Sequence, residues 1–205
     1  MKIVEKPKIS NKPTKKVLVL GYYREETTII DTLIDNDCEV WHTSDKIDSL
    51  ASYDLVISFG YRHIVSKNVI LSTNIPLVNL HIAYLPWNRG SHPNFWSFYD
   101  GTPSGVSIHL IDEGIDTGPI IAQQKINFSK DLKTFSQTYA HLRNQIEKLF
   151  KQNINTILNG EYAAIPQKGK GTYHNSKDLP EQFAGWESDI EEEINRLHLL
   201  DEIMS

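Results

Sequence analysis

The chain has a single cysteine, Cys38, among its 205 residues. One cysteine can build neither a disulfide framework nor a multi-cysteine metal site. No apolar run approaches the roughly 20 residues that a membrane-spanning helix needs. The first sixteen residues also lack the apolar stretch of a secretion signal. These absences predict a cytoplasmic protein without a membrane partner.

The chain has no basic patch interleaved with aromatic side chains, which is the pattern typical of nucleic-acid binding. Residues 1–16 contain six lysines and one glutamate, and are expected to be a flexible, solvated leader. Residues 178–205 carry nine acidic side chains and one arginine. Apolar residues recur at helical spacing in this end, at Ile190, Ile194, Leu197 and Leu200. We therefore predict an acidic amphipathic helix there, and no nucleic-acid partner.

Between these ends, apolar runs alternate with helical patterns. Continuous or β-rich runs predict strands over residues 17–21, 39–42, 55–59, 76–80, 105–111 and 120–128. Helical patterns cover residues 25–36 and 132–159, and Gly160 follows the second of these. Residues 165–180 are rich in glycine, lysine and polar side chains and are expected to be extended or loop-like. The alternation predicts an α/β fold with a mostly parallel central sheet.

Ligands of open α/β sheets bind at the carboxyl ends of the strands. The segment after the first predicted strand, Gly21-Tyr22-Tyr23-Arg24, matches neither glycine-rich phosphate loop, which disfavours a nicotinamide or ATP cofactor. The segment after the third, residues 60–66, is aromatic and apolar and would suit the edge of a flat heterocycle.

The fourth predicted strand carries the strongest signal. Asn79 and His81 are two positions apart, so on a strand both side chains point to the same face. Asp116 follows on a glycine-containing loop between two later strands. That loop lacks the spacing of a calcium-binding EF-hand. The separations of His81, His92 and His109 match no compact zinc signature, so no metal site is expected.

The motifs Asn79-Leu80-His81, Leu85-Pro86, Arg89-Gly90 and Asp116-Thr117-Gly118 strongly resemble the folate-dependent formyltransferases. The resemblance covers roughly residues 17–126. It implies a Rossmann-like formyltransferase domain, over residues 17–162, followed by a C-terminal extension over residues 163–205. It also implies N10-formyltetrahydrofolate as cosubstrate, and Asn79, His81 and Asp116 as catalytic residues. The positions at which the family holds the pterin correspond here to Tyr61, His63, Ile64, Val65, Leu110, Ile111, Asp112, Glu113 and Gly114.

The chemistry of formyl transfer suits these three side chains. A neutral amine attacks the formyl carbon, and charge develops on the formyl oxygen. Asn79 can donate a hydrogen bond to that oxygen. His81 can add a second donor or take the proton that the amine loses, and Asp116 can orient His81 or move a proton through water. Either His81 or Asp116 can be the immediate base.

Differences from the sequences of particular family members limit the possible acceptor substrates. The glycine-rich phosphate cradle of the glycinamide ribonucleotide enzymes is missing after the first strand. The acidic tail would repel the phosphate backbone of a tRNA, and we expect neither the large C-terminal domain of methionyl-tRNA formyltransferases nor the regulatory domain of formyltetrahydrofolate hydrolases. The stretch from Leu85 to Phe98 looks like the sugar-nucleotide N-formyltransferases. The resemblance thus implies a dTDP- or UDP-linked amino-dideoxy sugar, used for lipopolysaccharide O-antigen or another surface glycan.

Two alternatives remain beside this hypothesis: a formyltransferase for another amine, and a non-catalytic sugar-nucleotide or folate binder. Loop positions and the resemblance give the candidate acceptor-binding residues, which are Arg24, Tyr84, Trp87, Arg89 and Asn94. The aromatic residues from Phe95 to Tyr99 have near-helical spacing and are expected to belong to the core. Residues 171–174 either close the nucleotide site or form the contact of a homodimer.

Overall fold

The computed structural model describes residues 2–5 and 14–204. Its centre is a seven-stranded sheet with the order β1-β3-β2-β4-β5-β7-β8. These strands are β1 (Lys2–Glu5), β2 (Lys16–Gly21), β3 (Glu39–Thr43), β4 (Leu55–Phe59), β5 (Leu77–His81), β7 (Gly105–Leu110) and β8 (Ile120–Lys125). A second, two-stranded sheet pairs β6 (Arg89–Gly90) with β9 (Tyr173–His174).

The middle of the large sheet is parallel. Strands β3, β2, β4 and β5 pair in parallel, whereas β7 runs antiparallel to both β5 and β8. Strand β8 therefore points the same way as β5, which gives five strands in one direction and confirms the mostly parallel α/β prediction. The antiparallel insertion of β7 brings a second strand beside the end of β5, where Asn79 and His81 lie.

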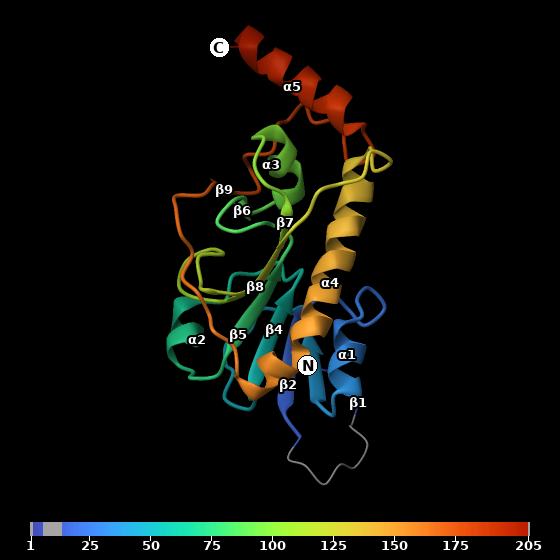
Figure 1. Ribbon diagram of the computed structural model, residues 1–205. Helices are drawn as coiled ribbons and strands as arrows, with labels where there is room; N and C mark the ends of the chain where they lie inside the picture. The colour runs from blue at the N-terminus through green and yellow to red at the C-terminus, as the bar shows by residue number, and fades with distance from the viewer. Residues whose placement is uncertain (1, 6–13, 205) are drawn as a thin grey trace.

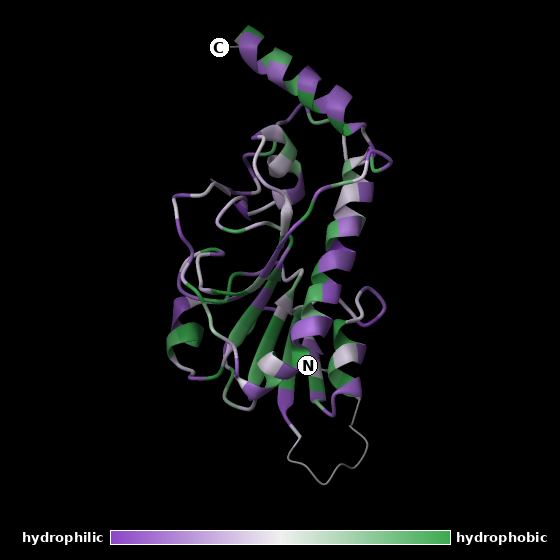
Figure 2. Ribbon diagram, in the orientation of Figure 1, coloured by the Kyte–Doolittle hydropathy of each residue, from purple (hydrophilic) through white to green (hydrophobic). Residues whose placement is uncertain are grey.

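Five helices accompany the strands in the described ranges: α1 (Ile29–Asp35), α2 (Lys67–Leu71), α3 (Pro93–Tyr99), α4 (Phe135–Asn159) and α5 (Ile190–Met204). Helices α1 and α4 lie along one face of the sheet (Figure 1). Their apolar residues, among them Leu33, Ile146 and Phe150, form one buried cluster with the sheet residues Val19 and Ile57. In Figure 2 the strands behind α4 are coloured largely as hydrophobic, whereas α4 itself shows both hydrophobic and hydrophilic residues. Each such buried side chain contributes about 1.5–3 kcal/mol to folding.

Two helices begin later than the sequence predicts. Helix α1 begins at Ile29 rather than at residue 25, and the hydroxyls of Thr27 and Thr28 just before it bond to the carboxylate of Glu147 on α4 at 2.8 and 2.7 Å. Helix α4 begins at Phe135 because Thr134 and Gln137 form a capping box. It ends where Gly160 takes the left-handed conformation, φ +71°, as Gly160 was expected to allow.

The N-terminal end of the chain differs in part from the prediction, whereas the C-terminal end contains the predicted helix. Residues 2–5, inside the segment expected to be a flexible leader, form the edge strand β1 and pair antiparallel with β3. Residues 6–13 of that segment lie outside the described residues. The predicted amphipathic helix is α5, which packs on α3, with Leu197 buried beside Phe95 and Trp96. Across the described ranges, no helix is long and apolar enough to cross a membrane.

The chain between α4 and α5 returns across the molecule to the start of β8 and to β6 (Figure 1). Ile165 forms a bridge with Ile120 at the start of β8, and β9 then pairs with β6. Backbone bonds continue this contact: Arg89 N–H donates to Thr172 O at 3.1 Å, and Ser91 N–H donates to His174 O at 2.8 Å. The segment expected to be extended, residues 165–180, thus holds the loop that contains β6 through these backbone bonds.

Candidate active site

The end of β5 places Asn79 and His81 beside a single carboxylate, that of Asp116. Asn79 Nδ2 donates to Asp116 Oδ1 at 3.1 Å, and His81 Nε2 lies 3.6 Å from Asp116 Oδ2. Asn79 and His81 come from one strand and Asp116 from the loop between β7 and β8. The structure therefore brings together the three side chains that the motifs single out.

Asp116 is fixed in an unusual backbone conformation, with φ +52°. Its Oδ2 accepts the backbone N–H of Gly90 at 2.8 Å, which ties the loop to β6. Burial by itself raises the pKa of this carboxyl, but His81, His109 and the Gly90 N–H together outweigh burial and hold the pKa well below its ordinary value. The group is thus an ionised carboxylate in a largely water-excluded position.

His81 is 8% exposed, and its Nε2 lies 3.1 Å from the carbonyl oxygen of Asn88. A carbonyl oxygen only accepts hydrogen bonds, so Nε2 carries a proton and the neutral ring has its lone pair on Nδ1. Asn88 itself has φ +57° and is 1% exposed, and its side chain bonds to the hydroxyls of Thr102 and Thr172. The partner of His81 is therefore held in place from two sides.

His109 is a further member of this cluster. From the sequence, His109 is considered only as a possible zinc ligand. Its Nδ1 donates to Leu110 O at 2.7 Å, so in the neutral ring Nε2 accepts from Asn79 Nδ2 at 3.1 Å. His109 stands opposite Asn79 in the register of β5 and β7. Only the pairing of these two strands would have revealed it.

The segment after β4 and the loop after β7 lie side by side. Lys67 Nζ and Glu113 Oε2 form an ion pair at 2.6 Å between them, and Val65 packs in a buried cluster with Ile111. The Tyr61 hydroxyl donates to Asp45 O, and the Tyr61 and His63 rings are in edge contact.

Ile64 of the segment after β4 is 72% exposed, and Ile115, which precedes Asp116 in the chain, is 38% exposed. Glu113 and Gly114 are exposed, and the Asp112 carboxylate accepts from Gly114 N–H and from the Thr117 hydroxyl, which shapes the loop.

The candidate acceptor residues do not form one group. Arg24 Nη2 pairs with Asp31 of α1 at 2.7 Å on the surface. Asn94 is 3% exposed, and its Nδ2 donates to Phe135 O and to the Thr138 hydroxyl, so it joins α3 to α4 and is a structural residue rather than a lining residue of the site. Phe95 and Trp96 belong to the same buried region, as expected.

Trp87 and Arg89 lie on the loop between β5 and α3, and Gly90 of the same loop donates its N–H to the Asp116 carboxylate. Trp87 is half-buried, and its backbone N–H donates to the backbone carbonyl of Tyr84. Arg89 donates through Nε and Nη2 to Gln167 Oε1, at 3.1 and 2.7 Å. Gln167 was absent from the predicted site, and it comes from the returning segment after α4.

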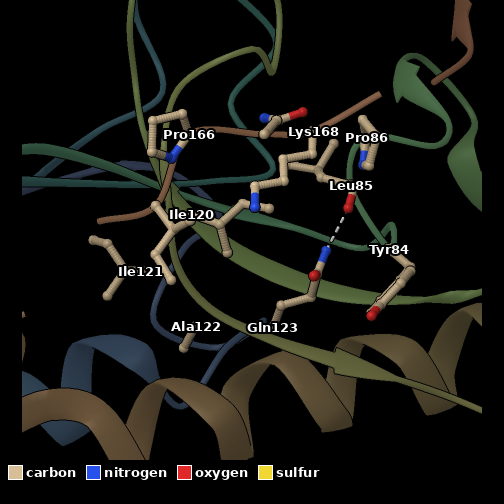
Figure 3. A pocket seen from close by; sticks show the side chains of 11 residues that line it. Tyr84, Leu85, Pro86, Ile120, Ile121, Ala122, Gln123, Pro166 and Lys168 are labelled. Atoms are coloured by element: carbon tan, nitrogen blue, oxygen red, sulfur yellow. Dashed lines mark hydrogen bonds between the residues drawn. The ribbon is translucent and has the colours of Figure 1, made fainter. Parts of the chain in front are cut away.

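A cavity of about 490 Å³ opens behind this loop (Figure 3). Its walls come from residues 84–86, from β8 and from residues 165–168, and Gln123 Nε2 donates to Leu85 O across it at 2.6 Å. Tyr84 and Gln167 belong to its lining. Within the part of the chain that the structure describes, no group of three or more His, Cys, Asp or Glu side chains is arranged to hold a metal ion.

The sequence pattern of the formyl transferase family matches residues 31–154, which is more than half of the chain. The chain belongs to the formyl transferase family. The family that the Asn-x-His and Asp-x-Gly motifs indicate is thereby confirmed.

Relatives with curated names include a dTDP-4-amino-4,6-dideoxyglucose formyltransferase of Mycobacterium tuberculosis, 33% identical over 127 residues. That match covers 62% of this chain and 53% of the relative. A methionyl-tRNA formyltransferase of Myxococcus xanthus is 30% identical over 119 residues, which is 58% of this chain and 38% of that protein. This formyl transferase chain thus spans about half the length, or less, of the curated relatives that it matches.

Among solved structures, the crystal structure of the formyltransferase PseJ from Anoxybacillus kamchatkensis has a TM-score of 0.78 and 38% identity. The match covers 86% of this chain and 96% of PseJ, which was crystallised in complex with UDP-4,6-dideoxy-4-formamido-L-AltNAc and tetrahydrofolate. The α/β fold of this formyl transferase is therefore that of PseJ.

Proposed function

We propose that the protein transfers a formyl group from N10-formyltetrahydrofolate to the amine of a nucleotide-linked amino-dideoxy sugar. The observation that carries the proposal is the arrangement of Asn79 and His81 around the ionised, buried carboxylate of Asp116. A protein that only binds a sugar nucleotide or a folate has no need of a titratable ring held against such a carboxylate.

In this proposal His81 accepts the proton of the attacking amine at Nδ1. An imidazole changes its charge between about pH 5 and 8, which suits a base for an amine proton. The protonated ring gains support from Asp116 Oδ2 at 3.6 Å and keeps its Nε2–H bond to Asn88 O. Asp116 thus orients the ring and stabilises its cation. When the bond between the formyl carbon and N10 breaks, the proton held by His81 would pass to N10, so that tetrahydrofolate leaves as a neutral amine.

Asn79 is the proposed donor to the oxygen on which charge develops. Its Nδ2 already donates to Asp116 Oδ1 and lies 3.1 Å from His109 Nε2. One of these bonds must be exchanged when the tetrahedral oxygen forms. A donor of this kind is worth about 3–4 kcal/mol of barrier.

The formyl donor is proposed to bind between residues 61–65 and residues 110–116, and when bound it supplies the carbon that is transferred. In this proposal the exposed aliphatic groups of Ile64 and Ile115 give its ring an apolar surface, and the ion pair of Lys67 with Glu113 joins the two segments. The buried carboxylate of Asp116 stands at the end of the same loop.

The sugar-nucleotide acceptor is proposed from two similarities, to the dTDP-amino-sugar enzyme and to PseJ, whose complex contains a formylated UDP-sugar. Trp87 offers a flat face for a base or sugar ring, and Arg89 retains Nη1 hydrogens for phosphate oxygens beyond its bonds to Gln167. The role in surface glycan synthesis, the cytoplasmic location, the homodimer and the domain division at residue 162 stay predictions, as does the absence of nucleic-acid and membrane partners.

The test is a panel of acceptors incubated with the purified protein and N10-formyltetrahydrofolate. The panel holds dTDP-4-amino-4,6-dideoxyglucose, the UDP-linked 4-amino sugar whose formylated form is bound in PseJ, the two free amino sugars, glycinamide ribonucleotide and methionyl-tRNA. We expect formylated product, followed by mass spectrometry, with one of the nucleotide sugars. The free sugars should react more slowly, because binding energy from the nucleotide positions the amine. Equal turnover of a free sugar, or turnover of methionyl-tRNA alone, would overturn the acceptor assignment.

A further inference from the structure

One glutamine connects the loop that carries Asp116 to the loop that carries Arg89. Gln167 Nε2 donates to the carbonyl oxygens of Asp116 and Gly118, both at 2.8 Å. Its Oε1 accepts from Nε and Nη2 of Arg89. All the hydrogen-bonding capacity that a side-chain amide offers through its two N–H groups and its oxygen is therefore spent on these two loops.

The backbone that Gln167 holds is not one that a free loop would keep. Asp116 has φ +52°, a conformation that is uncommon for a residue with a side chain. The backbone carbonyls of Asp116 and Gly118 face Gln167. The Asp116 side chain faces Gly90 and His81 instead. The two hydrogen bonds from Gln167 Nε2 thus fix the direction in which the Asp116 carboxylate faces the His81 ring.

The same returning segment secures the other partner of His81. Thr172 Oγ1 accepts the Asn88 N–H at 2.8 Å and lies 3.0 Å from Asn88 Oδ1. The carbonyl of Asn88 is the group that accepts from His81 Nε2. Residues 167 and 172 therefore support, from one stretch of chain, both groups that face this ring nitrogen.

We infer that Gln167 is a positioning residue of the transfer reaction: it ties the Asp116 loop to the Arg89 strand and so sets the distance between the Asp116 carboxylate and the His81 ring. The inference rests on the proposed function, and it adds a residue outside the family motifs. Gln167 contacts none of the reacting groups itself. Its two ends have separable effects, because Nε2 acts on Asp116 and Oε1 acts on Arg89.

This separation defines the informative variant, Gln167→Glu. A glutamate keeps an acceptor for Arg89 but loses the two N–H groups that hold the carbonyls of Asp116 and Gly118. We expect kcat to fall by about 10- to 100-fold, since a misplacement near 1 Å costs that much, while KM for the nucleotide sugar stays within about threefold. Gln167→Met, which loses both ends, should lower kcat and also raise that KM. The matched control is Gln152→Met on the exposed surface of α4, which should resemble the wild type.

A second measurement separates positioning from a loss of stability. In an Asp116→Asn background, Gln167→Met should cost little further kcat, because two changes that act through one group are not additive. A purely structural role would lower kcat by the same factor in both backgrounds, or would lower only the thermal midpoint, and either outcome overturns the inference. Unchanged kcat in Gln167→Glu overturns it as well.

A readout without turnover distinguishes failure of this inference from failure of the proposed function. The ring Cε1–H signals of His81 and His109 in NMR spectra should shift in Gln167→Met and stay in place in Gln152→Met. If the wild type formylates none of the panel acceptors, the proposed function fails. A shift of the His81 and His109 signals in Gln167→Met would then still support the positioning of these rings by Gln167, and unchanged signals would overturn it. If transfer occurs and the signals do not move, the inference about Gln167 is wrong.

Discussion

Nε2 of His109 lies 3.4 Å from Oδ1 of Asp116, the carboxylate oxygen that does not face His81. The carboxylate thus has an imidazole at each oxygen. The two N–H groups of the Asn79 amide fill the space between His109 and Asp116, with Nδ2 at 3.1 Å from each. His109 therefore fixes the direction of the Asn79 amide, which in turn donates to the carboxylate.

We expect His109→Phe to lower the free energy of unfolding by about 1–3 kcal/mol, because one N–H of the half-buried Asn79 amide loses its acceptor. The same change should lower kcat, since the Asn79 amide can then turn. Urea unfolding and steady-state kinetics measure the two effects. His109→Gln, whose side-chain oxygen can occupy the place of Nε2, should recover most of both. Equal losses in Phe and Gln variants would contradict this role.

His81→Ala should abolish most of the turnover, with kcat reduced by about 10²- to 10⁴-fold, the usual contribution of a general base. Binding of folate and of the nucleotide sugar, measured by calorimetry, should change little because the proposed role lies in the transition state. His198→Ala on the exposed surface of α5 is the matched control and should behave as wild type. Turnover near normal in His81→Ala would rule out the proposed base.

Asp116 gives a prediction for the pH dependence of stability. Its pKa is depressed in the folded protein, and an aspartate in an unfolded chain titrates near about 3.9. The stabilisation from the ionised form is therefore complete above that pH and is lost as the pH falls toward the lower folded pKa. The wild type should exceed Asp116→Asn in free energy of unfolding at pH 7, and the difference should narrow below about pH 4. A difference that is constant from pH 7 to pH 3.5 would contradict the depressed pKa.

Gly118→Ala tests the glycine of the Asp-x-Gly motif. A Cβ at this position would lie 1.8 Å from the carbonyl oxygen of Leu110, so the loop would have to move, and Asp116 with it. Overpacking of this kind costs about 1–3 kcal/mol of stability, and we also expect a lower kcat. For comparison, Gly101→Ala meets no atom within 4 Å but has φ +62°, so it should cost only backbone strain and leave kcat unchanged. Similar kinetic losses in both variants would show that the contact with Leu110 is unimportant.

Much of the sheet was predictable because its strands are buried on both faces. The run over residues 55–59 is apolar throughout apart from Ser58, and it forms β4 with the predicted bounds. The start of α1 was not predictable, because the bonds of Thr27 and Thr28 to Glu147 join residues about 120 positions apart. Such contacts leave no periodic signal in the local sequence.

The same distinction applies to the site. Asn79, His81 and Asp116 are found by spacing and by family motif, and the structure brings them together. His109 depends on the register of β5 with β7, and Gln167 depends on where the chain passes after α4. Asn94 shows the opposite error: it lies near the motif in sequence, but the helix turns its side chain toward Phe135.

The contact of Asn88 with Thr172 joins residues 84 positions apart. Contacts between distant residues require the closure of a long loop, so they form after the local helices and neighbouring strands. On the ribosome, every strand of the large sheet would emerge before the segment that secures Asn88 and the Asp116 loop. We therefore expect the catalytic centre to assemble only after residue 172 has left the ribosome, so that a shorter nascent chain cannot consume the formyl donor.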